Sequence, residues 1–351
     1  MKPLKEYLTE GILDIEDNLD KDYIKIQIED FIKDNYGCGK LGTNDNYNYN
    51  YLFDDSDRLQ IIKLKDKYIV NFDYWDGVIV KNKNIESLTN GLFEWGEVGK
   101  FDCSRCDKLQ SLKGAPKEVD YFNCSFCKSL KSLEGAPKIV TSDFNCSNCI
   151  SLKSLKGAPE KVGNSIDISS CFNCSNCVSL KSLEGAPKEV VGDFNCSHCV
   201  SLKSLEGAPE RVAIFDCSYC KSLQSLEGAP KKTNYFNCSH CISLKSLEGV
   251  LKMSVGVFNC HFCKSLKSLE GAEEIITRDF NCSNCPSLQS LEGAPERVTI
   301  FDCSYCKSLQ SLEGAPKKTD YFYCKSRKGS NKVFSKEDVE EVCDVRKSIA
   351  V

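Results

Sequence analysis

One pattern of apolar and polar positions repeats along most of this chain. Each copy reads Phe-Asn/Asp-Cys-Ser-x-Cys-x-Ser-Leu-Lys/Gln-Ser-Leu-Glu-Gly-Ala-Pro, as in Phe194–Pro209. The first cysteines of the copies stand at positions 103, 124, 146, 174, 196, 217, 238, 260, 282, 303 and 324, so the period is 21 or 22 residues except for one interval of 28. A fixed period of this length predicts a solenoid, in which each unit buries its apolar side only against its neighbours.

The apolar positions within one copy predict a strand followed by a turn. Alternate residues of a strand share a face, so Phe194 and Cys196 point the same way. Because a large aromatic residue at every copy belongs inside, the first cysteine lies inside with it. We therefore expect the Phe-x-Cys segments to form parallel strands about 4.8 Å apart in one long sheet.

The chain on either side of the array predicts end caps. Helical spacing of apolar residues predicts helices over 1–20 and Tyr23–Tyr36, and alternation predicts paired strands over Leu59–Leu64 and Tyr68–Phe72. Val78–Val80 begins a degenerate first repeat, because one face of a terminal unit meets water. The predicted organisation is an amphipathic segment over 1–20, an α+β cap with the degenerate repeat over 21–99, the repeats over 100–324, and a C-terminal capping helix within 325–351 that starts at Ser335.

The 24 cysteines allow three interpretations. Twenty of them form ten Cys-x-x-Cys pairs, from Cys103/Cys106 to Cys303/Cys306, and this spacing is also that of zinc sites. The repeat phase favours buried thiols instead, with the first cysteine of each pair inside and the second at the turn. In-register parallel strands hold equivalent cysteines side by side, without the convergence that disulfides need. We expect no metal and no cofactor, and a metal-binding or redox thiol protein is the alternative.

Charge and hydropathy exclude several classes of partner. The 46 basic and 50 acidic residues are interspersed and leave a net charge of −4, without the basic block that nucleic-acid binding requires. No run of 18 apolar residues suggests a membrane span, and the charged start has no apolar core of a signal peptide. These observations indicate a cytoplasmic, reducing compartment. The three histidines form no recognisable catalytic triad, so we expect no enzyme activity.

Three positions vary between copies while the apolar positions stay fixed: the residue before the Phe, the residue between the paired cysteines and the residue after the second cysteine. The first two should line the concave sheet and its edge, where solenoids usually bind. Aromatic residues are enriched at protein interfaces, so these positions predict a surface for a protein partner. The alternative is that they vary because nothing packs on them. The candidates are Tyr121, Phe126, Tyr219, Tyr235, His240, Phe262, Tyr305 and Tyr321.

A block of the array occurs twice. Asp193–Tyr235 matches Asp279–Tyr321 almost residue for residue, at an offset of 86 positions or four repeats. Duplication of a block of repeats enlarges a binding surface, whereas an active site needs one unique arrangement of residues. The duplication therefore favours an extended surface over catalysis.

The repeat unit resembles the leucine-rich repeats of small proteins encoded by tailed bacteriophages and by phage-derived loci in bacteria, in a subtype that contains cysteine. The usual form has Asn at the turn and Leu two residues later, whereas this chain has Cys and a Leu shifted by one place. The resemblance covers about residues 78–343. It implies a leucine-rich-repeat solenoid: a curved parallel β-sheet with an irregular convex side, a small α+β N-terminal cap and a short C-terminal helix.

The N-terminus resembles the capsid-targeting peptide of internal head proteins in T-even-like phages. Those peptides are cut after Leu/Ile-x-Glu, and Leu8–Gly11 matches this rule with a cut between Glu10 and Gly11. An ordinary amphipathic helix is the alternative. The combined hypothesis is a non-enzymatic scaffold that binds a protein partner, located in the host cytoplasm or the virion interior. A purely structural virion component is a further alternative.

Overall fold

The computed structural model describes residues 19–38, 59–64, 67–72, 77–80, 82–96, 98–164, 169–250, 252–326 and 329–351. The predicted N-terminal segment lies outside these residues except for its last two positions. The candidate processing site at Glu10 and Gly11 also lies outside them.

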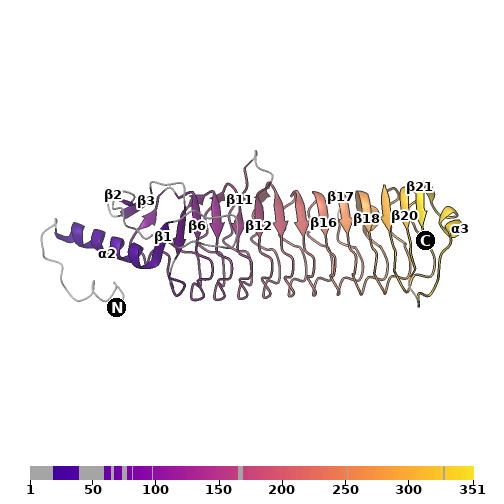
Figure 1. Cartoon of the computed structure of the whole chain (residues 1–351), viewed down its shortest axis with the longest axis horizontal. Helices are drawn as coiled ribbons and strands as arrows, with labels where there is room; N and C mark the ends of the chain where they lie inside the picture. The colour runs from indigo at the N-terminus through magenta and orange to yellow at the C-terminus, as the bar shows by residue number, and fades with distance from the viewer. Residues whose placement is uncertain are drawn as a thin grey trace.

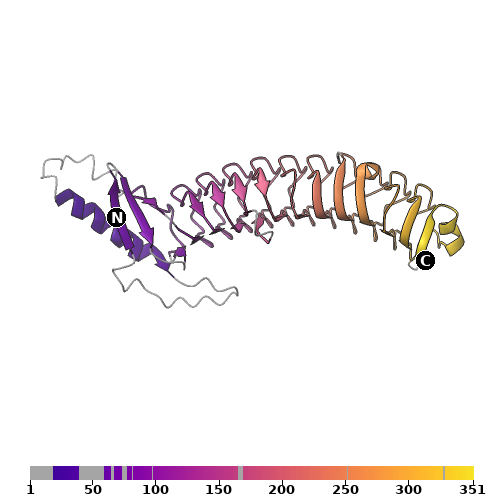
Figure 2. The same ribbon diagram turned by 90° about the horizontal axis from the view of Figure 1, so that it is seen from above.

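A single sheet of fourteen strands runs the length of the described chain (Figure 1). From β6 to β20 every strand is parallel to the next, and each repeat's Phe is in register with the Phe of its neighbour. Figure 2 shows that the array curves along its length. The predicted solenoid is thus confirmed. Its repeat strands are β6 (Lys100–Asp102), β8 (Tyr121–Asn123), β10 (Phe144–Asn145), β12 (Cys171–Asn173), β14 (Asp193–Asn195), β15 (Ile214–Asp216), β16 (Lys232–Asn237), β17 (Met253–Asn259), β18 (Ile275–Asn281), β19 (Ile300–Asp302) and β20 (Lys318–Tyr323).

The core is a continuous column of identical side chains. The Phe rings from Phe101 to Phe322 are at most 1% exposed and lie 5.2–5.8 Å apart between centroids. The first cysteine of every repeat is at most 3% exposed, which confirms the predicted strand phase. Burial of each such aromatic contributes a few kcal/mol, and truncation to Ala typically costs about 3–5 kcal/mol.

The N-terminal cap closes one end of the sheet. β4 (Val78–Val80) is parallel to β6 and places Val78 beside Phe101, in the register of a repeat strand. β1 (Tyr36–Cys38) pairs antiparallel with β4 and forms the sheet edge. The predicted hairpin is present as β2 (Leu59–Leu64) and β3 (Lys67–Phe72), with β5 (Glu94–Trp95) parallel to β3.

The second predicted helix differs from the structure at both ends. The helix, α2, spans Leu19–Asn35, so it begins four residues earlier than predicted and ends one residue earlier. Tyr36 belongs to β1 because its ring is fully buried 5.1 Å from the ring of Trp95, and its hydroxyl donates a hydrogen bond to the Leu88 carbonyl. Among the described helices, none is both long enough and apolar enough to span a membrane.

A second, smaller sheet accompanies the first half of the array. Four short strands form a second parallel sheet next to the first half of the main sheet. In β16, β17, β18 and β20 the equivalent residues instead form the first part of the main-sheet strand. The short strands are β7 (Glu118–Val119), β9 (Ile139–Val140), β11 (Lys161–Val162) and β13 (Glu189–Val190).

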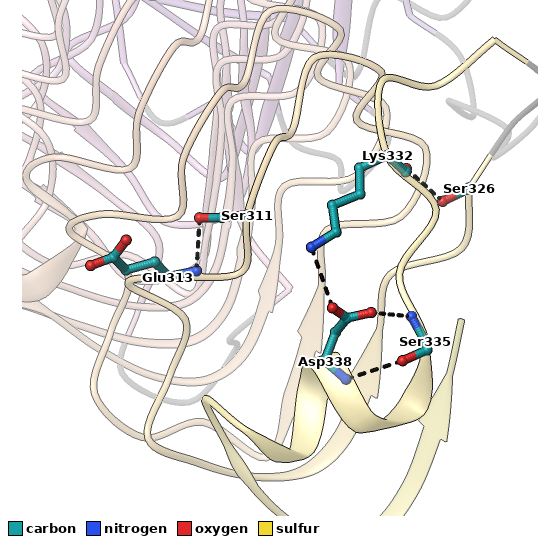
Figure 3. A network of polar contacts seen from close by, with 6 residues as sticks. All are labelled: Ser311, Glu313, Ser326, Lys332, Ser335 and Asp338. Atoms are coloured by element: carbon teal, nitrogen blue, oxygen red, sulfur yellow. Dashed lines mark hydrogen bonds and ion pairs between the residues drawn. The ribbon is translucent and has the colours of Figure 1, made fainter.

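The C-terminal cap combines a helix with a final strand. The predicted helix is α3 (Lys336–Glu340), where the Ser335 hydroxyl accepts from the Asp338 amide at 3.2 Å and the Ser335 amide donates to the Asp338 carboxylate at 2.7 Å (Figure 3). After this helix, β21 (Asp344–Ala350) adds a parallel strand beside β20, which was not predicted. A register shift between β20 and β21 interrupts the alternation by which this strand would be recognised.

Candidate binding surface

The turn after each strand has the same geometry in ten repeats. The Asn or Asp that follows the Phe accepts a hydrogen bond from the amide two residues later, as in Ser197 to Asn195 at 2.9 Å. This side chain replaces a backbone acceptor and stabilises a tight turn. The other nine bonds measure 2.7–3.2 Å and join Ser104 to Asp102, Ser125 to Asn123, Ser147 to Asn145, Ser175 to Asn173, Ser218 to Asp216, Ser239 to Asn237, His261 to Asn259, Ser283 to Asn281 and Ser304 to Asp302.

The residue between the paired cysteines has left-handed backbone in every one of these turns. Its φ lies between 57° and 65°, a region that side chains other than those of Asn, Asp and Gly rarely occupy. The left-handed turn directs the side chain away from the core, one strand spacing from the same position in the next repeat. The residues are Arg105, Phe126, Asn148, Asn176, His198, Tyr219, His240, Phe262, Asn284 and Tyr305.

The second cysteine of each pair anchors the turn to the preceding repeat. The Cys199 thiol donates to the Cys174 carbonyl at 3.2 Å, and the equivalent bond occurs in nine repeats at 3.1–3.4 Å. Burial raises the pKa of the Cys196 thiol well above its ordinary value, so it stays protonated. Within the described residues, no group of three or more His, Cys, Asp or Glu side chains is arranged to hold a metal ion.

Four of the turn residues stack into a row that we call the ring ladder: His198, Tyr219, His240 and Phe262. Successive ring centroids are 4.4, 4.2 and 4.7 Å apart, with interplanar angles of 6°, 11° and 19°. His261 packs edge-on against the ladder, 5.1 Å from His240. Because the ring faces cover one another, the ladder presents mainly ring edges at the surface.

Polar atoms of the ladder are only partly satisfied. The His240 Nε2 lies 3.5 Å from the Tyr219 hydroxyl, and the buried His240 Nδ1 has no hydrogen-bond partner among the described residues. Burial lowers the pKa of His240, and repulsion from Lys264 and His198 lowers it further. Burial and the neighbouring His240 likewise lower the pKa of His261, whose Nδ1 lies 2.8 Å from the Asn259 amide oxygen. Both imidazoles are therefore biased towards the neutral form.

The eight predicted residues separate into three groups. Tyr219, His240 and Phe262 come together in the ring ladder. Phe126 lies under the Arg105 guanidinium, which is 4.8 Å from its ring centroid, and Tyr305 occupies the same turn position further along the array. The other three precede a buried Phe and face outward from the sheet, half-buried: Tyr121, Tyr235 and Tyr321.

The sequence analysis missed two members of this surface. His198 occupies the same variable turn position as Tyr219, so its place in that column could have identified it. His261 stands where most repeats have Ser, between Cys260 and Phe262, and this departure was the available signal. Stacking itself could not be predicted, since it depends on the left-handed turns.

No family profile matches the chain, and no curated protein matches it. One similar solved structure is a leucine-rich repeat protein from Bacteroides ovatus, with 15% sequence identity and a TM-score of 0.31. The match covers 86% of this chain and 99% of the other. A similarity this low implies nothing about function, so the fold assignment rests on the chain's own geometry. In that geometry the chain is a parallel β-solenoid built from leucine-rich-repeat-like units.

Proposed function

We propose that this chain is a non-enzymatic repeat scaffold that binds a protein partner through the ring ladder and the outward face of the adjoining strands. The ladder is the observation that carries the proposal. In a repeat whose other positions are nearly constant, four consecutive turns hold stacked rings at the surface.

The rigidity of the ladder supports a binding role. Each ring is held by a left-handed turn, and stacked rings cover both faces of Tyr219 and His240 and one face of His198 and Phe262. Little side-chain entropy therefore remains to be lost on binding. Tyr and His edges combine apolar area with hydrogen-bonding atoms, which is the composition typical of recognition surfaces.

The chemistry of the surface favours binding over catalysis. The hydroxyl next to His240 is that of Tyr219, a phenol at 3.5 Å, and the paired thiols donate to backbone carbonyls inside the core. Neither arrangement activates a nucleophile, because activation needs a base aligned with an accessible hydroxyl or thiol.

The test uses a substitution that the chain itself makes at this position. Asn occupies the left-handed position at 148, 176 and 284, so Tyr219→Asn combined with Phe262→Asn removes two rings and keeps the backbone. In affinity capture from host lysate, the double variant should lose a partner that the unaltered protein retains. Arg105→Asn, in the same column outside the ladder, is the matched control. Equal capture by all three proteins contradicts the proposal.

The resemblance to phage proteins supports a more specific setting, in which the protein is phage-encoded and is packaged in the head or acts in the host cytoplasm. We predict that virion-derived protein begins at Gly11, while protein expressed alone keeps residues 1–10. Chain termini are common sites of proteolysis, and the repeats begin far downstream of this site, so we expect the array to stay folded after the cut. Mass spectrometry of the mature N-terminus is the measurement, and uncut protein in mature particles contradicts packaging by this route.

A further inference from the structure

The duplicated block places the same three residue types on the outward face at two points of the sheet. The first copy lies on β14, β15 and β16, and the second lies on β18, β19 and β20, four strands further along. Each residue directly precedes a buried Phe and therefore faces away from the core. The first copy is Asp193, Ile214 and Tyr235, and the second copy is Asp279, Ile300 and Tyr321.

In the second copy, two basic side chains of the protein itself contact the acidic and aromatic residues. The Arg278 Nε lies 3.4 Å from the Asp279 carboxylate. Lys347, on β21, places its Nζ 5.4 Å from the centroid of the Tyr321 ring and 2.9 Å from the carboxylate of Asp320. In this copy the acidic end and the aromatic end each hold a basic side chain.

The first copy has glycine at both of these places. Gly192 precedes Asp193 where Arg278 precedes Asp279. Tyr235 pairs with Val257 as Tyr321 pairs with Ser348, so Gly256 stands where Lys347 stands. No described Lys or Arg forms an ion pair with Asp193, whose pKa is raised by burial despite a hydrogen bond from the Ile214 amide. The first copy thus has the same acidic and aromatic side chains as the second copy, but it lacks the two basic side chains that contact them there.

The surrounding face has a charge that complements a cation. From β12 to β20, the residues on either side of each buried Phe include four acids and no Lys or Arg. Ile214 lies between the acidic and aromatic ends and is 39% exposed, so it can contact the aliphatic stem of a long basic side chain. The acids are Asp193, Asp216, Asp279 and Asp302.

We propose that the first copy binds a segment of the partner protein that carries two basic side chains, one paired with Asp193 and one over the ring of Tyr235. This inference rests on the proposed function, because it names the chemistry of the partner. Two strand spacings separate the two ends, which places the basic groups about 10 Å apart. Residues seven apart on one face of a helix have this separation, at about 1.5 Å per residue.

The test uses a defined probe. The probe is a fluorescent Ala-rich helical peptide with two Arg residues seven positions apart, compared at low ionic strength with the same peptide carrying two Glu residues. The Arg peptide should raise anisotropy on binding, and added salt should weaken it because exposed charges are screened. Asp193→Asn should reduce its affinity about three- to fivefold, as for a partly exposed ion pair.

Gly192→Arg copies the in-chain cation of the second copy and should reduce the affinity similarly. Arg278→Gly combined with Lys347→Ser should instead free Asp279 and Tyr321 of the second copy for binding. Each protein molecule should then bind two peptides rather than one. Glu189→Gln makes the same charge change away from this face and should leave binding unchanged.

Two results overturn the inference: binding of the Glu peptide as tightly as the Arg peptide, or unchanged affinity in both Asp193→Asn and Gly192→Arg. Self-association of the chain in place of peptide binding, detected by sedimentation, also overturns it in favour of a second copy as the occupant. If the peptide fails while Tyr219→Asn with Phe262→Asn still abolishes partner capture, the proposed function stands and only the basic chemistry of the partner is wrong.

Discussion

At the scale of single residues, the surface depends on ten side chains that hold left-handed backbone without being glycine. This conformation costs about 1–2 kcal/mol for an ordinary L-residue. The Asn or Asp side chain before the turn offsets part of that cost, and so does the turn amide, as where the His198 amide donates to the Ser218 carbonyl at 2.8 Å. The position is free to vary because its side chain is directed out of the core.

The first residue-scale prediction concerns the buried thiols. Cys196→Ser should lower the free energy of unfolding by about 1–3 kcal/mol, because burying a hydroxyl in place of a thiol costs more desolvation and the Cys220 thiol beside it is only a weak hydrogen-bond partner. Chemical denaturation measures the loss. Native mass spectrometry should find no stoichiometric zinc, and alkylation under denaturing conditions should label the repeat cysteines. Several zinc ions per chain contradict this prediction and favour a thiol-metal protein.

The second residue-scale prediction concerns pH. The pKa values of His240 and His261 are lowered in the folded state, so the unfolded chain binds protons more readily at these positions. Their contribution to stability should be complete above the unfolded pKa of about 6.5 and should fall as pH drops through that value towards the lowered folded pKa. Denaturation midpoints between neutral and mildly acidic pH measure the effect. His240→Asn, which keeps the left-handed turn, should flatten the dependence, and an unaltered slope contradicts the assignment.

At the scale of elements, the Glu-Gly turn fixes how closely two repeats approach. Gly207 has φ of 93°, and a Cβ there would lie 2.6 Å from the Leu183 carbonyl oxygen of the preceding repeat. The same close approach recurs at Gly135, Gly157 and Gly228, where the nearest atoms also belong to the preceding repeat's backbone. Glycine is therefore needed at these positions for two reasons: it adopts positive φ without strain, and a Cβ would collide with the backbone of the preceding repeat.

We predict that Gly207→Ala destabilises the protein by more than Gly91→Ala does. Both residues have positive φ, so both variants carry backbone strain of about 1 kcal/mol or more. Gly91 has no atom within 4 Å of the added Cβ, whereas Gly207 forces the two repeats apart. Urea denaturation of the two variants isolates the contact from the strain. Equal losses contradict the contact as the cause.

Most elements of the array and of its caps follow from the sequence, while β21, the bounds of α2 and the ring ladder do not. The Phe-x-Cys phase predicts the strands because every copy faces the same environment. β21 could not be predicted, since its pairing depends on β20 and a register shift hides the alternation around Val345. The end of α2 was misplaced because a buried contact of Tyr36 overrides its local preference. Variation between repeats identified the candidate binding residues, but only the geometry of the left-handed turns shows which of them stack into the ring ladder.

At the scale of the whole molecule, stability is distributed along one dimension. Each repeat contacts only the repeat before and after it, so the total is approximately a sum over neighbouring pairs. The two ends are the exceptions, where β1 and β21 cover the terminal strands. The array can therefore change length without a change in any internal contact.

We predict that deleting Phe194–Asp279, an 86-residue unit that joins Asp193 directly to Phe280, yields a folded and shorter solenoid. The junction reproduces the native order of residue types, so the Phe column should close across it. Circular dichroism should show the same strand signal per residue, and small-angle scattering should show a length reduced by about 19 Å, or four strand spacings. An unfolded or aggregated product contradicts independence of the repeats.

The direction of the sheet's hydrogen bonds has a mechanical consequence. In this solenoid the strands lie across the long axis, so the bonds between neighbouring strands point along it (Figure 1). A force that pulls the two ends apart loads these bonds in sequence, as in opening a zipper, and never shears a whole row at once. Each yielding repeat except the one of 28 residues releases 21 or 22 residues, which extend by about 70 Å where one strand spacing had been. The molecule is thus built to lengthen under tension in small steps that are equal in all repeats but one.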